Sequence, residues 1–484
     1  MPEYKTPGVY IEEIPHLPPS IVSVGTAIPV FIGYTEKAIK KATDDLIGKN
    51  WRIKSALEYK TYFGGPPKEP DGAISVTFNN STGTLDVLGV VDETKRSKYL
   101  LYYSLQMFFA NGGGICYIQS VGTYVDGGLI DNDLLTTALE EAKKENEITL
   151  IVFPDAINIA SSDNYYNLHN AAVQQCVNLQ NRFVVLDVYR TTANASNLWS
   201  GDIDIARSAV AGKVGMAGDT DHLKYAAVYF PRIYTLVNYN AHETLVKITG
   251  VGIVDNKNAA VILPATMDAL QGKFNSFYNL AKQAINDIEM LLPVAASIVG
   301  IYTQVDDARG VWKAPANVNI QNAVTPEVLI TKEDQDTLNV DQVAGKSINA
   351  IRPFTGRGNA IVWGARTLAG NDNEWRYISV RRFFIMMEQS VKNATEQFVF
   401  EPNDENTWVR VRGMIYNYLS QQWKAGALMG ASVKEAFFIH VGLGQTMTEV
   451  DIWEGRMKIE IGVAVVRPAE FIILQFSHKM LSET

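Results

Sequence analysis

The chain has 484 residues, 47% of them hydrophobic and 20% charged, which is enough for two to four domains of ordinary size with well-filled cores. Its net charge of −9 argues against a general nucleic-acid-binding protein, because phosphate binding needs clustered lysine and arginine. Its two cysteines, Cys116 and Cys176, cannot form a disulfide framework and favour folding in a reducing compartment.

The sequence predicts neither export through a cleaved signal nor insertion into a membrane. It begins Met-Pro-Glu-Tyr, without the basic and apolar regions of a secretory signal. The nearest approach to a membrane span, residues 291–302, is too short. We therefore expect a soluble protein that is made in the cytoplasm.

Both ends of the chain have the pattern of apolar β-strands, where frayed polar tails are usual. An apolar strand with unpaired backbone groups invites pairing with another chain. We therefore predict two arms that complete a sheet by strand addition, including a sheet of a neighbouring copy. The predicted arm residues are Val9, Tyr10, Ile11 and Ile14 at one end, and Phe471, Ile472, Ile473, Leu474 and Phe476 at the other.

After the first arm and its linker (1–20), residues 21–345 alternate between apolar strands and helices. This pattern is typical of an α/β sheet that helices cover on both faces. Two polar, turn-rich stretches, 65–99 and 235–262, are predicted insertions. The predicted strands are 28–34, 115–118, 148–153, 183–188, 224–230 and 295–301, and the predicted helices are 99–110, 132–145, 163–180, 202–212 and 266–288.

From residue 346 to 466 the pattern changes to that of a separate α+β domain. Two helices, 377–398 and 404–425, carry apolar residues at alternating steps of three and four. Asn403 or Asp404 can cap the second helix, and Gly426 can follow its end. The predicted strands are 347–351, 359–363, 436–441, 458–466 and, in the C-terminal arm (467–484), 471–476.

Candidates for catalysis are few. Asp155 and Asp187 follow predicted parallel strands, where open α/β sheets bind ligands, but Asp155 comes directly after a proline and is better explained as a turn cap. His169 and Cys176 share a helical stripe with apolar residues, which favours a core position over a nucleophile–base pair. Residues 345–347 lack the first glycine of a phosphate-binding loop. We predict no catalytic, cofactor-binding or metal-binding residues, with an α/β hydrolase built on the middle region as the enzymatic alternative.

A set of segments, in order along the chain, together resembles the tail sheath protein family of contractile phage tails and related injection machines. Each motif is weak by itself, whereas the ordered set is specific and extends over essentially the whole chain. The segments include Pro7-Gly-Val-Tyr-Ile-Glu-Glu13, Phe31-Ile-Gly-Tyr-Thr35, Phe108-Phe-Ala-Asn-Gly-Gly113, residues 306–317, Ile351-Arg-Pro-Phe-Thr-Gly-Arg-Gly358, Val362-Trp-Gly-Ala-Arg-Thr-Leu368, Tyr377-Ile-Ser-Val-Arg-Arg-Phe-Phe384 and Arg467-Pro-Ala-Glu-Phe-Ile472.

The resemblance implies a structural, non-enzymatic subunit that polymerises as stacked hexameric rings around an inner tube and contracts to drive the tube through a target cell envelope. It implies a subtilisin-like middle domain without catalytic residues, a C-terminal α+β sheath domain, and terminal arms exchanged between subunits. The implied partners are further copies of the chain, the inner tube protein, baseplate and tail terminator or cap proteins, and a second sheath paralogue. Nucleic acid is not among them.

The resemblance also implies a location and an inner surface. The subunit would lie in the bacterial cytoplasm during assembly, and then in a virion tail or a released extracellular particle. Residues 21–36 are more similar to the sheaths of phage-tail-like particles than to the sheaths of phages. A surface-layer or adhesin subunit is a further alternative, disfavoured without a secretion signal. In such sheaths the C-terminal domain lies innermost, so one charged helix start is a candidate tube-facing surface, although a solvated helix start explains its acidic residues equally well. The tube-facing candidates are Glu401, Asp404, Glu405, Arg410 and Arg412.

Overall fold

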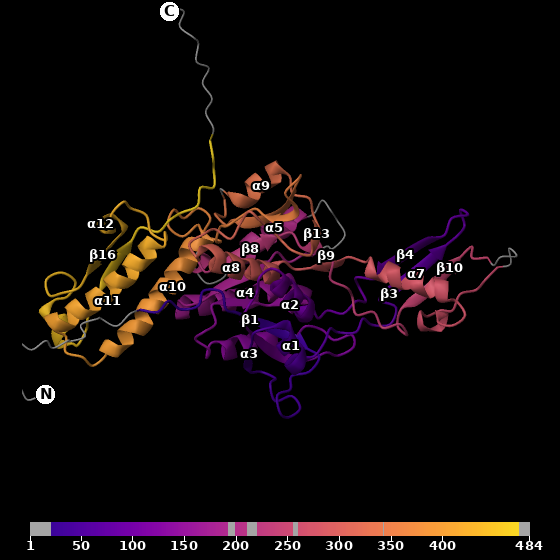
Figure 1. Ribbon diagram of the computed structural model, residues 1–484, viewed down its shortest axis with the longest axis horizontal. Helices are drawn as coiled ribbons and strands as arrows, with labels where there is room; N and C mark the ends of the chain where they lie inside the picture. The colour runs from indigo at the N-terminus through magenta and orange to yellow at the C-terminus, as the bar shows by residue number, and fades with distance from the viewer. Residues whose placement is uncertain (1–20, 192–198, 211–219, 255–259, 342, 474–484) are drawn as a thin grey trace, which may run out of the picture. The chain divides into compact units, whose positions relative to one another are not determined.

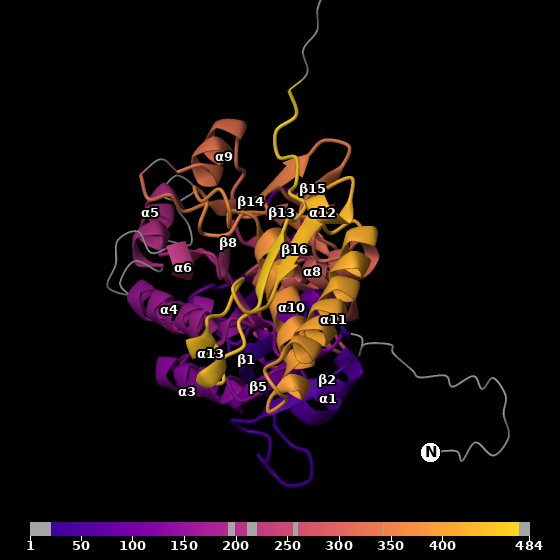
Figure 2. The same cartoon turned by 90° about the vertical axis from the view of Figure 1, so that its left-hand side faces the viewer.

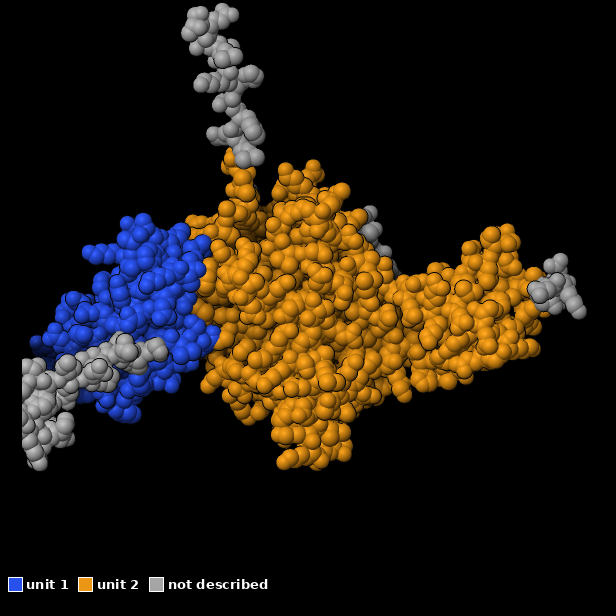
Figure 3. All heavy atoms as spheres, in the orientation of Figure 1, with its two compact units in different colours: residues 1–24, 387–466 blue, residues 25–386, 467–484 orange. Residues whose placement is uncertain are grey.

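The computed structural model describes residues 21–191, 199–210, 220–254, 260–341 and 343–473. The chain divides into two compact units (Figure 3). Unit 1 comprises Met1–Val24 with Met387–Val466, and unit 2 comprises Gly25–Met386 with Arg467–Thr484. Among the described residues, no helix has both the length and the apolar character that crossing a bilayer requires.

Unit 2 is built on a nine-stranded sheet with the order β12-β15-β14-β8-β7-β6-β1-β5-β2. Two of these strands, β1 and β8, are labelled in Figure 1. The run from β14 to β5 is parallel, and β2, β15 and β12 add antiparallel edges. The strands are β1 (Pro29–Thr35), β2 (Asn50–Ile53), β5 (Cys116–Thr123), β6 (Leu150–Val152), β7 (Phe183–Asp187), β8 (Ala226–Phe230), β12 (Val318–Asn319), β14 (Ile348–Phe354) and β15 (Gly358–Val362).

The central strands are buried along their whole length, which explains their nearly continuous apolar sequences. Two helix pairs, α2 with α8 and α3 with α4, pack against them. The helices of unit 2 are α1 (Ala56–Phe63), α2 (Leu101–Ala110), α3 (Asn132–Ala142), α4 (Ser162–Leu179), α5 (Trp199–Ala209), α6 (Thr220–Leu223), α7 (Asn275–Asn286), α8 (Ala295–Arg309) and α9 (Lys332–Asn339), with short 3₁₀ turns at Pro154–Asn158 and Asp268–Leu270.

One predicted strand is wrong. Residues 295–301 form the first part of α8, and every residue from Ala295 to Tyr302 is buried. A helix that is buried all round has no polar face, so its sequence cannot be told from that of a buried strand by periodicity. Gly300 permits the close approach of α2, because a Cβ there would lie 2.5 Å from the carbonyl oxygen of Phe108.

The two predicted insertions meet in one small sheet, with the order β10-β3-β4. β3 (Ile74–Asn79) pairs antiparallel with β4 (Asp86–Val91) from the same insertion, and parallel with β10 (Lys247–Val251) from the other. α7 packs on this sheet (Figure 1). A further sheet joins β9 (Ile233–Thr235), β11 (Met290–Leu292) and β13 (Ala323–Pro326).

The start of the C-terminal domain differs from the prediction. β14 and β15, which the sequence analysis assigns to the domain 346–466, belong to the nine-stranded sheet of unit 2, where β14 pairs in parallel with β8. The division between the units falls instead at residues 386 and 387, inside α10 (Ile378–Thr395). An isolated apolar strand does not reveal its distant partner, because pairing is decided by the rest of the sheet.

Unit 1 contains the second half of α10, the long helix α11 (Glu405–Lys424) and an antiparallel pair of strands, β16 (Phe437–His440) and β17 (Glu460–Val463), against which α11 packs (Figure 2). As predicted, Asp404 caps α11, accepting a hydrogen bond from the Thr407 amide, and Gly426 follows the helix end with φ of 87°. Short helices at Val433–Ala436 (α12) and Glu449–Trp453 (α13) and a 3₁₀ turn at Glu396–Phe398 complete the unit.

Candidate functional site

Asp155 lies where an open α/β sheet would bind a ligand. The order β5-β1-β6 means that the chain crosses over in opposite directions from β1, which makes the carboxyl ends of β1 and β6 a switch point. The Asp155 carboxylate fills this place. It accepts hydrogen bonds from the amides of Tyr34 (2.7 Å), Leu100 (2.5 Å) and Leu101 (2.8 Å), and so caps the start of α2. It has no exposed surface, and burial raises its pKa to about 6, although the three amides oppose this rise.

Asp187 has the same role at the end of the neighbouring strand, β7, where it caps α8. It ends β7 and accepts hydrogen bonds from the amides of Val294 (2.7 Å) and Ala295 (3.2 Å) at the start of α8. Burial raises the pKa of this carboxyl to about 6 as well. The two carboxylates therefore hold the amino termini of the two helices that pack against each other, α2 and α8.

Three further candidates from the sequence, His169, Cys176 and Lys346, also have structural roles. His169 donates one hydrogen bond from Nδ1 to the carbonyl of Tyr165 (2.8 Å) inside the core, and burial lowers its pKa to about 4. Burial raises the pKa of the Cys176 thiol to about 12, so it is a poor nucleophile. Lys346 donates to the carbonyls of Arg207 and Val210 (both 2.6 Å) and is not available to a phosphate.

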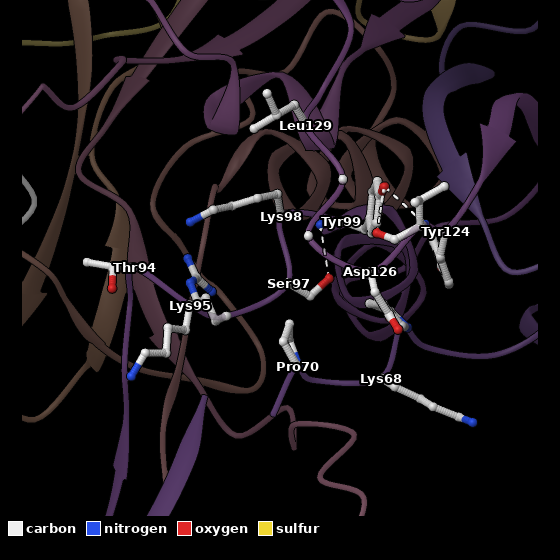
Figure 4. A pocket seen from close by; sticks show the side chains of 15 residues that line it. Lys68, Pro70, Thr94, Lys95, Ser97, Lys98, Tyr99, Tyr124, Asp126 and Leu129 are labelled. Carbon is white, nitrogen blue, oxygen red and sulfur yellow. Dashed lines mark hydrogen bonds between the residues drawn. The ribbon is translucent and has the colours of Figure 1, made fainter. Parts of the chain in front are cut away.

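A hollow of about 200 Å³ opens in unit 2 between residues 67–70, 94–99 and 124–129 (Figure 4). The Tyr99 hydroxyl donates to the Val125 carbonyl (3.3 Å), and the Tyr99 ring stacks on Tyr124. Two of its cations are paired outside it, Lys95 with Asp92 and Arg96 with Glu93. The lining residues bring no nucleophile together with a base. Throughout the described segments, no three histidine, cysteine or acidic side chains are placed to hold a metal ion.

The predicted arms are only partly described. Val9, Tyr10, Ile11 and Ile14, as well as Leu474 and Phe476, lie outside the described residues. Phe471, Ile472 and Ile473 are 69%, 80% and 82% exposed and form no strand within this chain. Three consecutive large apolar side chains in water are unfavourable unless another surface covers them.

The paired strands of unit 1 have open edges. β16 pairs with β17 from Phe437 opposite Val463 to His440 opposite Glu460, and among the described residues neither strand has a second full strand beside it. The chain continues the ladder only past the end of β17, where the Met429 amide donates to the Ala464 carbonyl (2.7 Å). Two strands alone are marginally stable, so this pair can accept further strands on its outer edges.

The predicted tube-facing residues all lie at the start of α11 and are all exposed. Glu401 forms an ion pair with Arg410 (2.8 Å), and Asp404 is the helix cap. Glu405 stands in the first turn, where its charge favours the helix. A neighbour that the sequence analysis did not single out is Phe400, which is fully exposed and has a φ of 70°, uncommon for a bulky side chain.

The sequence analysis also missed a polar cluster around Glu470 and Arg366 in unit 2. Both residues lie in segments that carry the family resemblance, 362–368 and 467–472, but single charges in such segments look like ordinary surface residues. Their pairing across 104 positions had no signal in the sequence.

Comparison with known proteins gives consistent likenesses. Residues 370–479 match the family described as phage tail sheath C-terminal domain. The chain is 25% identical over 171 residues to the tail sheath protein of Enterobacteria phage T4; the match extends over 34% of this chain and spans about a quarter (24%) of that longer protein. The anti-feeding prophage (AFP) helical sheath in its contracted state is 29% identical, with a TM-score of 0.63, over 98% of this chain and 100% of that chain. The PVC sheath complex of an extracellular contractile injection system, also contracted, is 27% identical, with a TM-score of 0.61, over 99% of both chains.

These likenesses define the class of the protein as a structural component of contractile tails and tail-like injection particles. More specifically, residues 370–479 match the C-terminal domain of the phage tail sheath family, and the chain is similar to the T4 tail sheath protein over a third of its length and to the AFP and PVC sheaths over nearly all of it. The family predicted from the ordered motifs is therefore confirmed. It is a family of structural proteins, which agrees with the helix-capping and core roles of Asp155, Asp187, His169 and Cys176.

Proposed function

We propose that this chain is the sheath subunit that polymerises as stacked hexameric rings around an inner tube and contracts to drive the tube through a target cell envelope. The observation that carries the proposal is the likeness over nearly the full length of both chains to sheaths solved in a contracted, helical state. A likeness to a chain of the AFP baseplate, 29% identical over 99% of this chain with a TM-score of 0.61, supports baseplate proteins as partners.

In this proposal the two terminal arms link subunits by strand exchange. The exposed Phe471, Ile472 and Ile473 would lie on the open edges of the β16–β17 pair of a neighbouring copy, and residues 1–14 would do the same from the other end. An added strand of about six residues makes several backbone hydrogen bonds, each worth roughly 1 kcal/mol net. Each buried Phe or Ile side chain adds about 1.5–3 kcal/mol. Such links can hold while rigid bodies move.

Contraction then needs only a small free-energy preference of each subunit for the contracted state over the extended state. A single two-state switch needs about 5.5 kcal/mol to move from 1:99 to 99:1, whereas many coupled subunits share that requirement. Contacts between successive rings that do not close on themselves generate the helical stack. The energy for contraction comes, in this proposal, from contacts between rigid domains, since the arms remain paired in both states.

The remaining assignments follow from the same proposal. The middle region corresponds to the subtilisin-like domain, the helices and strands after residue 386 to the C-terminal sheath domain, and the joint β10-β3-β4 sheet to the outward-facing insertions. The exposed start of α11 faces the tube protein, and a tail terminator or cap and a second sheath paralogue complete the partners. The particle assembles in the bacterial cytoplasm and then acts as a virion tail or a released particle.

The test is removal of one arm at a time. Deleting residues 1–14 or residues 471–484 should leave a folded subunit with an unchanged circular dichroism spectrum that forms no sheath in negative-stain micrographs. Co-expression with the tube protein should not restore assembly. Long contractile tubes from either truncated chain would show that the arms do not link the subunits.

A further inference from the structure

Near its start, the C-terminal arm (467–484) is held at a polar site around Glu470, which lies within unit 2. The Glu470 carboxylate accepts hydrogen bonds from Arg366 on both oxygens, with Nε at 3.0 and 3.1 Å and Nη2 at 2.6 Å. The Asn339 side-chain amide donates to Oε1 at 2.7 Å, and the Tyr377 hydroxyl donates to Oε2 at 3.2 Å. Each carboxylate oxygen thus has at least two donors, a geometry that fixes the position of the side chain.

The scaffold holds this site together. The Arg366 side chain is only 3% exposed, and its Nη1 donates to the carbonyls of Asn339 (3.2 Å) and Gly370 (3.3 Å). Asn339 is the last residue of α9, and Tyr377 directly precedes α10. A buried guanidinium oriented in this way needs an anionic partner, because its charge would otherwise be uncompensated. Although burial opposes it, the hydrogen bonds from Arg366 and Asn339 lower the pKa of Glu470.

The contrast with the next residues is sharp. Arg467, at the start of the segment, donates to the Asn373 carbonyl at 2.9 Å, so both ends of residues 467–470 are held. Directly after Glu470 the chain presents Phe471, Ile472 and Ile473 to solvent. The polar site therefore separates a fixed segment from a free apolar segment.

We infer that Glu470 and its site form an arm anchor, which fixes the point from which the C-terminal arm leaves its own subunit and so directs it to one neighbouring copy. Arg366, Asn339 and Tyr377 are positioning residues in this reading. The inference rests on the proposed strand exchange and adds to it where the exchanged segment begins.

The anchor limits both the reach and the freedom of the arm. Residues 471–484 can span at most about 46–50 Å when fully extended. Without the anchor, residues 467–470 would also be free, and their ordering on pairing would cost conformational entropy for four more residues. The effective concentration of the arm at its receiving sheet would fall, because a longer free linker spreads the same arm over a larger volume.

The experiment uses the full-length chain with Glu470→Ala or Glu470→Gln, and Glu374→Ala as a control in an exposed acidic residue of the same unit. A spin label on Ala469→Cys reports the anchor, because both natural cysteines are fully buried. In the unassembled subunit, the label at residue 469 should give a slow-motion spectrum in the chain that keeps Glu470 and in the Glu374→Ala control. It should give a fast-motion spectrum in both Glu470 variants. A label on Ile473→Cys should move fast in all of them. The protein concentration needed for sheath assembly should rise on the order of tenfold in the Glu470 variants.

The outcomes separate the anchor from the proposed function. A label at residue 469 that is equally mobile with and without Glu470 overturns the anchor. A label that is released while assembly is unchanged also overturns it, because the arm would then need no fixed origin. Assembly by a chain truncated after Glu470 would instead contradict strand exchange, and in that case the label still reports whether residues 467–470 are held. Released label together with weakened assembly supports the inference.

Discussion

Replacing Asp155 tests whether this carboxylate is a structural cap, and the size of the expected loss of stability depends on pH. Asp155→Ala leaves the amides of Tyr34, Leu100 and Leu101 without their acceptor in a site closed to water. A buried unsatisfied donor costs about 1–3 kcal/mol. For three such donors we therefore expect the free energy of unfolding to fall by about 3–9 kcal/mol, a large fraction of the stability of an ordinary domain.

Asp155→Asn gives the sharper measurement, because asparagine resembles the protonated acid at every pH. Since the pKa of Asp155 rises from its ordinary value of 3.8 to about 6 on folding, the native state binds more protons than the unfolded state between these values. The free energy that this group contributes is present below pH 4 and is lost as the pH rises through 6, by about 3 kcal/mol in all. The penalty for Asp155→Asn should therefore be smaller at pH 7.5 than at pH 5.

Urea denaturation at the two pH values, followed by circular dichroism, measures this difference. Asp187→Asn should behave in the same way, because burial also raises the pKa of Asp187 to about 6. A penalty for Asp155→Asn that is larger at pH 7.5 would refute the reasoning, since it would mean that the three amides outweigh burial and lower the pKa. A hydrolytic activity that disappears with either Asp→Asn variant while assembly persists would refute the capping role altogether.

Three further substitutions should change stability in defined directions. Gly33→Ala should lower the melting temperature, with a cost of about 1–3 kcal/mol, because its Cβ would clash with the Asp155 carboxylate; an unchanged melting temperature would contradict the close approach. Phe400→Gly should stabilise unit 1 by about 0.5–1 kcal/mol in urea denaturation, because glycine adopts a φ of 70° without strain. Arg382→Met should cost about 3–5 kcal/mol, since it leaves the buried Asp306 carboxylate without its ion partner at 2.5–3.0 Å; Asp306→Asn in the same background should recover part of that loss.

Most elements could be predicted from the sequence because their signals are local. The cap at Asp404, the glycine after α11 and the apolar strands such as β7 depend on residues within one or two turns of each other. The helical stripe of His169 and Cys176 likewise showed that these residues belong to the core.

What could not be predicted depends on distant contacts. β14 carries an ordinary apolar sequence, and only its pairing with β8 assigns it to the sheet of unit 2. The first part of α8, Ala295 to Tyr302, has no polar face because its surroundings cover it completely. The three amides around Asp155 and the four donors around Glu470 converge from segments far apart in the chain, so each residue by itself looked unremarkable. The arms were predictable as apolar segments, but their point of attachment was not.

The joint sheet of the two insertions has a consequence for how the protein can change in evolution. β3 lies between β4 and β10, so it is the central strand of a sheet to which the two insertions contribute, more than 150 residues apart in sequence. Loss of residues 235–262 alone would expose one edge of β3, and loss of residues 65–99 alone would expose the edge of β10 that pairs with β3. The two insertions should therefore be gained and lost together among relatives, and a shortened subunit for engineering should remove both at once.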